Sequence, residues 1–306
     1  MAEITRRRTG ELLRVLFGLL RTAPDGLQAS AALRQLAARV QLTPYEAGDY
    51  ESGGRRFEKI VRFATVDCVK AGWLSKHKGI WTLSTEGLRA YERWPDPEEF
   101  YREAVRRYDA WKRAQPDAPL ADSTANAAPD AGFTDTSVAE IASLSLDQAE
   151  EMAWGAITRF LNGMPPYQFQ QLVGDLLGAM GYHVAWVAPP GKDGGTDLLA
   201  YNDPLGTRPP RIKVQVKRNA ESARIDVQGL RSFMAVLGDE DIGIFVALSG
   251  FTRDAEQEAR SQSSRRVTLL DMGRFVDLWT EYYTRLDDAA RRRFPLRPVW
   301  FLASAD

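Results

Sequence analysis

The sequence predicts an α/β protein with two folded units, and three features of the chain support this expectation. The pattern of the first part of the chain predicts helices around one short hairpin, whereas that of the last part predicts alternating helices and strands. Residues 114–136, between them, are rich in Ala, Pro, Asp, Ser and Thr without a period of large apolar residues, so they cannot bury a core. We therefore expect a first unit at 1–114, a flexible linker at 115–140 and a second unit at 141–306.

The composition narrows the classes of protein that the chain can belong to. Hydrophobic residues make up 44% and charged residues 26% of the 306 residues, as in ordinary soluble proteins. No stretch approaches the roughly 18 apolar residues of a membrane span. Cys68 is the single cysteine, so no intrachain disulfide can form and we expect a cytoplasmic protein. His77 and His183 are the only histidines, which excludes a structural zinc site and chemistry based on paired histidines.

The N-terminal segment superficially resembles a secretion signal, because Arg6, Arg7 and Arg8 precede an apolar run. Glu11 and Arg14 interrupt that run, however, and the leucines recur at helical spacing. We expect an amphipathic first helix here.

Three helices and a hairpin are predicted to open the first unit, at residues 11–20, 29–40, 53–73 and 72–87. The spacing of the third helix predicts one buried face, formed by Phe57, Ile60, Val61, Ala64 and Cys68. Two further helices are expected at 84–94, with Ser84 or Thr85 as the cap, and at 96–113.

Basic residues gather on the outer face of the third helix and at the tip of the hairpin: Arg55, Lys59, Arg62, Lys76 and Lys78. Three helices followed by a basic two-stranded wing is the pattern of a winged helix, which binds duplex DNA through the third helix and the wing. The net positive charge of this unit also favours DNA binding, because residues 1–114 contain 21 Lys and Arg but only 15 Asp and Glu. Residues 115–162, in contrast, hold 1 against 8. The alternative is a charged face that is merely solvated.

Helices and strands alternate through the second unit. Helices are predicted at 145–164, 167–182, 226–238, 252–263 and 272–286, and strands at 183–188, 197–201, 212–218, 242–248 and 267–271. This alternation predicts a three-layer α/β/α sandwich around a mixed sheet.

Polar residues in two of these strands form the candidate site. Gln215 and Lys217 project from the same face of their strand about 7 Å apart, and glycines at 191, 194 and 195 allow a sharp turn just before Asp197. If the two strands pair, the three side chains can converge. A carboxylate, an amide oxygen and the backbone carbonyl of Val216 would suit Mg²⁺ or Mn²⁺, and the lysine could orient water and stabilise charge on a phosphate. The alternative is that Gln215 and Lys217 merely form the solvent-exposed face of a strand at the edge of the sheet.

Asp197 followed by Gln215-Val216-Lys217 resembles the signature of the PD-(D/E)xK nuclease superfamily, in particular its Mrr-like restriction endonucleases. The blocks "FQQLVGDLLGAMGY", "GKDGGTDLLAY", "VQVKR" and "SGFTRDAEQEA" resemble that family's catalytic domain in order. In the first unit, "KAGWLSKHKGIWTLSTEG" is similar to the winged-helix domain that precedes it in Mrr proteins.

The resemblance implies a restriction-endonuclease-like core and Mg²⁺-dependent cleavage of foreign duplex DNA, typically methylated, as in type IV restriction. It also implies that Asp197, Gln215 and Lys217 are the catalytic residues. Because one such site cuts one strand, we expect a homo-oligomer, at least a dimer.

The chain departs from the family pattern in one place. Gln170 stands where many members carry a glutamate, and Asp175 is a candidate substitute. This departure supports an alternative function, in which a degenerate nuclease core serves a non-catalytic DNA-binding protein as an assembly or regulatory module.

Overall fold

A computed structural model describes residues 4–50, 54–114, 138–189, 195–218, 224–262 and 265–301. Contacts divide the chain into two compact units, Met1–Gly155 with Trp300–Asp306, and Ala156–Val299. Residues 115–137 of the expected linker lie outside the described residues. Within the described ranges, no helix is long and apolar enough to cross a bilayer.

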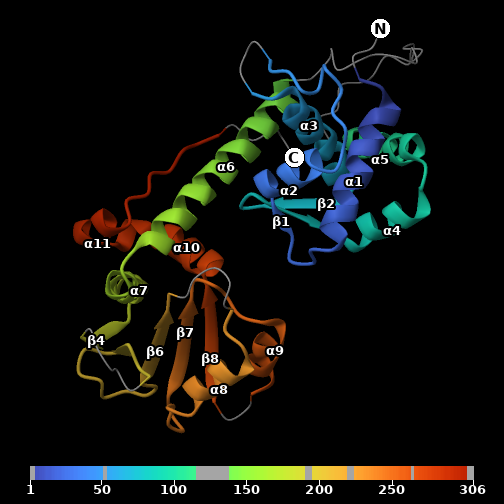
Figure 1. The fold of residues 1–306 in the computed structure, drawn as a ribbon. Coiled ribbons are helices and arrows are strands. Elements are labelled where there is room, and N and C mark those ends of the chain that lie inside the picture. Colours follow the sequence, from blue (N-terminus) through green and yellow to red (C-terminus); the bar gives the residue numbers. More distant parts are fainter. Residues whose placement is uncertain are drawn as a thin grey trace. The chain divides into compact units, whose positions relative to one another are not determined.

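The first unit is built from helices around a small antiparallel sheet (Figure 1). Its helices are α1 (Arg6–Arg21), α2 (Ala29–Ala37), α3 (Arg56–Lys70), α4 (Thr85–Arg93) and α5 (Pro97–Arg113). The expected amphipathic first helix is confirmed, because α1 buries Leu12, Leu13, Leu16 and Phe17 while Thr5 caps its N-terminus. Ser84, of the two candidates, caps α4 by accepting a hydrogen bond from the Gly87 amide at 2.9 Å.

The predicted hairpin consists of β2 (Leu74–His77) and β3 (Ile80–Leu83), which pair antiparallel. Lys78 and Gly79 form its two-residue turn with φ of 52° and 73°, as tight hairpin turns require. A short strand that the sequence did not predict, β1 (Leu27–Gln28), pairs with β3 and extends the sheet to three strands. Two residues are too few to show a period of two.

The core of the first unit includes the predicted inner face of α3. Phe57, Ile60, Val61, Ala64 and Cys68 are all buried there. Phe17 of α1 packs against Trp73 and Phe100 with ring centroids 6.5 and 5.1 Å apart. The aromatic side chains thus join α1, the start of the hairpin and α5.

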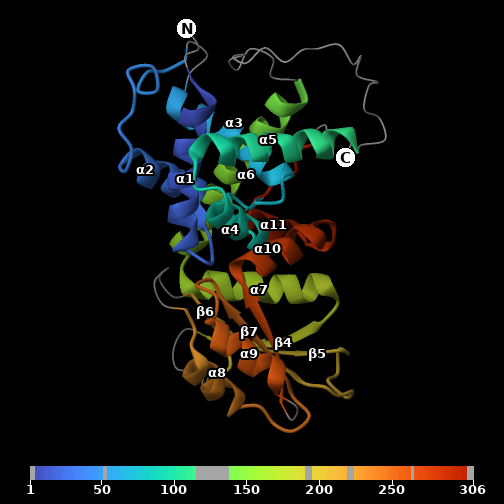
Figure 2. The same ribbon diagram turned by 90° about the vertical axis from the view of Figure 1, so that its right-hand side faces the viewer.

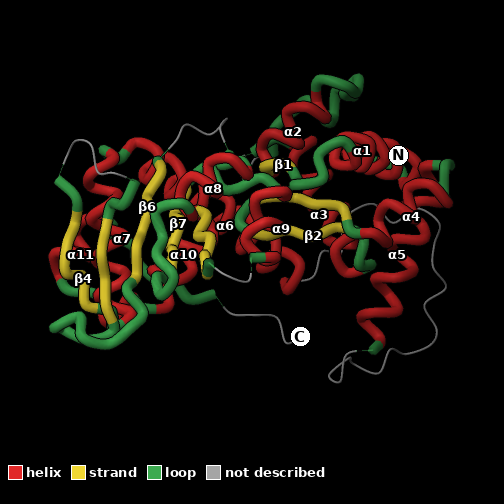
Figure 3. Tube along the Cα trace, turned by 90° about the horizontal axis from the view of Figure 1, so that it is seen from below, coloured by secondary structure: helices red, strands yellow, loops and turns green. Residues whose placement is uncertain are grey.

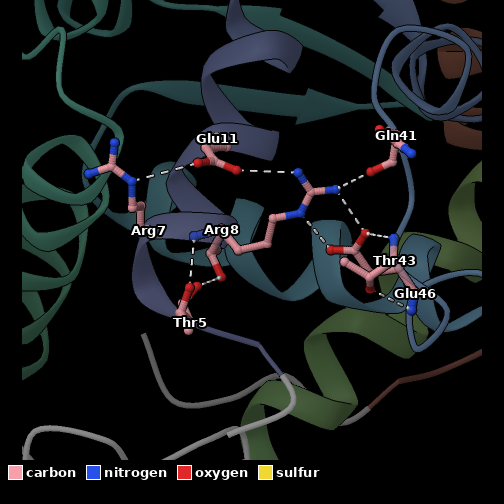
Figure 4. Close-up of polar contacts among 8 residues, drawn as sticks. Thr5, Arg7, Arg8, Glu11, Gln41, Thr43 and Glu46 are labelled. Atoms are coloured by element: carbon pink, nitrogen blue, oxygen red, sulfur yellow. Dashed lines mark hydrogen bonds and ion pairs between the residues drawn. The ribbon is translucent and has the colours of Figure 1, made fainter.

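A buried charge pair fixes the segment between α2 and α3 (Figure 4). Arg8 donates to both carboxylate oxygens of Glu46 at 2.8 Å, and to the carbonyl of Gln41 at 2.7 Å. The Thr43 amide also donates to Glu46, at 2.8 Å. Burial alone would raise the pKa of the Glu46 carboxyl, but the hydrogen bonds from Arg8 and Thr43 outweigh it and lower this pKa. The ion pair therefore holds at neutral pH.

The second unit contains a five-stranded sheet (Figure 3) in the order β4-β5-β6-β7-β8. These strands are His183–Val187, Leu198–Tyr201, Ile212–Lys217, Ile242–Ala247 and Arg266–Asp271. The first two pairings are antiparallel and the last two parallel. All five strands and the mixed sheet were expected from the sequence.

Helices cover both faces of this sheet. On one face lie α7 (Pro166–Met180) and α10 (Met272–Glu281), adjacent in Figures 1 and 2, where Phe169 meets Phe275 at 5.2 Å. On the other lie α8 (Val227–Met234) and α9 (Arg253–Ser261), whose apolar residues pack on Phe245 and Ala247 of β7. A 3-10 turn at Tyr283–Arg285 and a short helix, α11 (Asp288–Arg293), follow α10; α11 was not predicted.

The long helix α6 (Val138–Gly163) connects the two units along the chain. It begins inside the segment expected to be linker, and its side chains are described from Leu146 onward. Residues up to Gly155 belong to the first unit. This part of α6 contacts the basic residues of that unit, as set out below.

Candidate functional site

The pairing of β5 with β6 brings the polar candidates close to one another. Leu198 lies opposite Val214, and Asp197 is the residue just before Leu198. The Asp197 amide donates to the Val214 carbonyl at 2.8 Å, so Asp197 also contacts β6 although it precedes the paired residues of β5. Gln215 and Lys217 lie on one side of β6 because side chains alternate along a strand.

The Asp197 carboxylate is held by the backbone of the neighbouring strand. Its Oδ2 accepts a hydrogen bond from the Val216 amide at 2.8 Å. Asp197 and Gln215 are only 6% and 8% exposed, whereas Lys217 is half-buried and forms no ion pair with any described residue. The site thus combines an oriented buried carboxylate, a buried amide and a half-buried cation.

Gly195 shapes the approach to Asp197. Its φ of 86° requires the left-handed conformation that glycine adopts without steric cost. A Cβ at this position would lie 3.9 Å from Nε2 of Gln215. The end of the turn therefore lies against Gln215. Glycines 191 and 194 of the predicted turn fall outside the described residues.

Gln170 of α7 joins the two ends of the same turn by hydrogen bonds. Its side-chain Nε2 donates to the carbonyl oxygens of Ala188 and Asp197, both at 3.0 Å. The Ala188 amide in turn donates to the Asp197 carbonyl at 2.8 Å. Two backbone carbonyls, one on each side of the turn, thus converge on one buried amide. Only a hydrogen-bond donor suits this position, which is a physical reason for glutamine in place of glutamate.

Asp175, the candidate substitute acid, forms an ion pair with Arg293 of α11. Burial raises the pKa of the Asp175 carboxyl, although the hydrogen bond from Arg293 opposes this rise. Because α11 is only six residues long, no period of apolar residues indicates it, and this partner could not be predicted from the sequence.

The donor set fits a hard divalent cation with few protein ligands. In the described part of the chain, no three His, Cys, Asp or Glu side chains gather in a group that could hold a metal. Asp197 instead supplies one carboxylate, and Gln215 of the neighbouring strand one amide oxygen. Oxygen ligands of this kind suit Mg²⁺, which keeps several waters and is bound through one or two carboxylates together with substrate phosphate.

The predicted DNA-binding residues of the first unit fall into two groups. Arg55 is exposed at the N-terminus of α3, and Nζ of Lys59 lies 4.8 Å from the Tyr50 ring centroid. Arg62, expected on the same outer face, is buried with 8% exposure. That expectation is corrected because α6 covers this part of α3.

The residues of α6 that cover this face are acidic or aromatic. Glu151 binds Arg62 and Asp147 binds Lys76, both at 2.7 Å. Nζ of Lys78 lies 5.0 Å from the Trp154 ring centroid. These partners were not predicted; the one signal for them in the sequence is the excess of acids in residues 115–162.

Comparison with protein families identifies both units. A model described as restriction endonuclease, the Mrr catalytic domain, matches residues 161–279. The model of the Mrr N-terminal domain matches residues 12–93. The class is therefore that of the restriction endonucleases. Together the two models match more than half of the chain, and the chain belongs to the Mrr family, as the resemblance of its sequence blocks implied.

Other comparisons add little to this assignment. No curated protein matches the chain significantly. A solved structure, the MspJI restriction endonuclease in complex with a 27-mer oligonucleotide, matches with 16% identity and a TM-score of 0.36. The match covers 65% of this chain, and the chain spans 44% of the length of that structure.

Proposed function

We propose that the protein is a Mg²⁺-dependent endonuclease that cleaves foreign, methylated duplex DNA as a type IV-like restriction enzyme. One observation carries this proposal: the Asp197 carboxylate lies against β6, where it accepts a hydrogen bond from the Val216 amide, between Gln215 and Lys217. These residues all lie within the part of the chain that matches the restriction endonuclease model.

In this proposal Asp197, Gln215 and the Val216 carbonyl hold the cation. When bound, Mg²⁺ (or Mn²⁺) polarises a phosphate oxygen and lowers the pKa of water. The hydrogen bond from the Val216 amide holds the Asp197 carboxylate against the backbone of β6. The Lys217 ammonium orients the attacking water and stabilises the negative charge that develops on the phosphate. Gln170 positions Asp197 through its backbone rather than by touching the substrate.

We further propose that the first unit is a winged helix that docks on duplex DNA, and that the second has the restriction-endonuclease-like fold. The helices α1 to α3 followed by the β2–β3 hairpin support the winged helix, and so does the match to the Mrr N-terminal domain. Lys59 and Arg55 of α3 and the hairpin lysines would contact the phosphates.

A double-strand break requires two such sites, because each cuts one strand. We therefore propose that the enzyme acts as at least a dimer. Nicked plasmid should then precede linear plasmid, and the linear fraction should rise with protein concentration.

The direct test is to incubate the protein with methylated and unmethylated plasmid, in Mg²⁺ or in EDTA, beside Lys217→Ala. We expect cleavage of the methylated plasmid in Mg²⁺ only, lost in the variant because the ammonium that helps to stabilise the phosphate charge is then missing. Equal cleavage of both plasmids would contradict the modification dependence. Binding of DNA without cleavage in any condition would instead support the non-catalytic DNA-binding alternative.

A further inference from the structure

Helix α6 presents one stripe of side chains to the basic residues of the first unit. Asp147, Glu151 and Trp154 recur at spacings of four and three, which places them on one face of the helix. Their partners Arg62, Lys76 and Lys78, here called the basic face, come from α3 and the β2–β3 hairpin. Three of the five residues predicted to bind DNA are therefore in contact with this chain's own helix.

The Glu151 carboxylate is held as a phosphate would be. Its Oε2 accepts from the Arg62 guanidinium at 2.7 Å, and its Oε1 accepts from the Ser30 amide, at the N-terminus of α2, at 2.9 Å. An arginine guanidinium and a helix N-terminal amide are both common donors to phosphate oxygens. Glu151 also packs closely on the hairpin turn, where a Cβ on Gly79 would lie 3.0 Å from its Cα.

The second ion pair is shielded from water in the same way. Asp147 binds Lys76 at 2.7 Å, and the side chains of Lys76 and Arg62 are each only 10% exposed. Burial lowers the pKa of the Lys76 ammonium, while the Asp147 carboxylate opposes this fall. Nζ of Lys76 also lies 5.4 Å from the Trp81 ring centroid. These cations are therefore inaccessible to a large anion while α6 is in place.

We propose that α6 is an internal mimic of the DNA backbone: its carboxylates occupy the basic face in the free protein, and duplex DNA binds there by displacing them. This inference rests on the proposed DNA-binding function of the first unit. The same cations cannot neutralise both the carboxylates and the DNA phosphates, so the two ligands compete. Competition of this kind lowers the affinity for duplex DNA by the free-energy cost of releasing the two carboxylates.

The test is the affinity of the full-length Glu151→Gln variant for a labelled duplex, measured by fluorescence anisotropy in EDTA at fixed ionic strength. The variant keeps the shape of the side chain but loses the charge that binds Arg62. We expect it to bind DNA about tenfold more tightly than the wild type, within the usual range for coupling between two ligands.

Glu150→Gln is the matched control, because Glu150 is the exposed neighbour and the change in net charge is identical. It should bind like the wild type, and adding Lys76→Ala to Glu151→Gln should reverse much of the gain. If Glu151→Gln binds no more tightly than Glu150→Gln, while both bind DNA, the competition is refuted and DNA binding stands. If none of the proteins binds DNA although each unfolds at the wild-type temperature, the DNA-binding function itself fails.

Discussion

Among single residues, Gln170 links the position of Asp197 to the helix behind the sheet. Its amide group donates to the carbonyls on both sides of the glycine turn, so it fixes where Asp197 enters β5. A glutamate here would present oxygens to oxygens in a buried position. We infer that the departure from the family pattern serves the backbone of the site and is no sign of its decay.

The substitution Gln170→Glu should therefore impair the site. Removing a donor from two buried carbonyls is expected to cost about 1–3 kcal/mol of stability, and DNA cleavage should fall with it. Because protonation restores a donor to the introduced carboxyl, the stability difference from the wild type should shrink as the pH falls. Thermal unfolding across pH and plasmid cleavage together measure both effects.

Gln168→Glu on the same helix is the control, since Gln168 is exposed. It should leave the unfolding temperature and cleavage close to wild type. Equal behaviour of the two variants would show that Gln170 does not position Asp197.

The sequence predicts Asp197, Gln215 and Lys217 as site residues, but it does not predict the hydrogen bonds of Gln170 that hold the turn before Asp197. The period of two along 212–218 places Gln215 and Lys217 on one face, and the glycines predict the turn before Asp197. The hydrogen bonds of Gln170 go to carbonyls 18 and 27 residues away along the chain. No local pattern encodes such a contact, because any side chain with a donor can make it once the fold brings it there.

Among the elements, the segment between α2 and α3 depends on α1. Arg8 of α1 binds Glu46, whose own carbonyl accepts from the Phe57 amide at 3.1 Å in α3. The side chain of Glu46 is fully buried, whereas that of Arg8 is 22% exposed. One ion pair therefore positions the first turn of the helix that is proposed to read DNA.

Arg8→Ala should destabilise the first unit by about 3 kcal/mol, because it leaves a buried carboxylate without its partner. Its neighbour provides the matched control: Arg7 is 58% exposed and its ion pairs with Glu11 and Asp96 are at the surface, so Arg7→Ala should cost less than about 1 kcal/mol. Urea unfolding of the full chain measures the difference. Equal midpoints for the two variants would contradict the role given to the Arg8–Glu46 pair.

Most elements could be predicted because their periods are long enough to recognise. The helices from α1 to α5 and the five strands of the larger sheet follow the spacing of apolar residues. The two-residue strand β1 and the six-residue helix α11 are too short for a period. Their existence depends on neighbours, β3 for β1 and α7 for α11, that only the folded chain supplies.

For the whole molecule, the main correction concerns the basic surface. Helical spacing placed Arg62 with Arg55 and Lys59 on an open face, whereas Glu151 covers it. These two residues are 89 positions apart, and charge patterning alone cannot tell a solvated arginine from a paired one. Asp147 and Glu151, two of the acids after residue 114, are thus part of the DNA-binding mechanism that we propose, since they compete with phosphate for the basic face.

The most direct test of the central claim compares Asp197→Asn with Asp239→Asn in the nicking of supercoiled methylated plasmid with Mg²⁺. Asn keeps the shape of the side chain and an acceptor for the Val216 amide, but removes the only carboxylate proposed to bind the metal. Asp239 is an exposed aspartate of the same unit. We predict a loss of about a hundredfold or more for Asp197→Asn, as when a group that stabilises the transition state is removed, and wild-type cleavage for Asp239→Asn. Unchanged nicking by Asp197→Asn would contradict the assignment of the nuclease centre to β5 and β6.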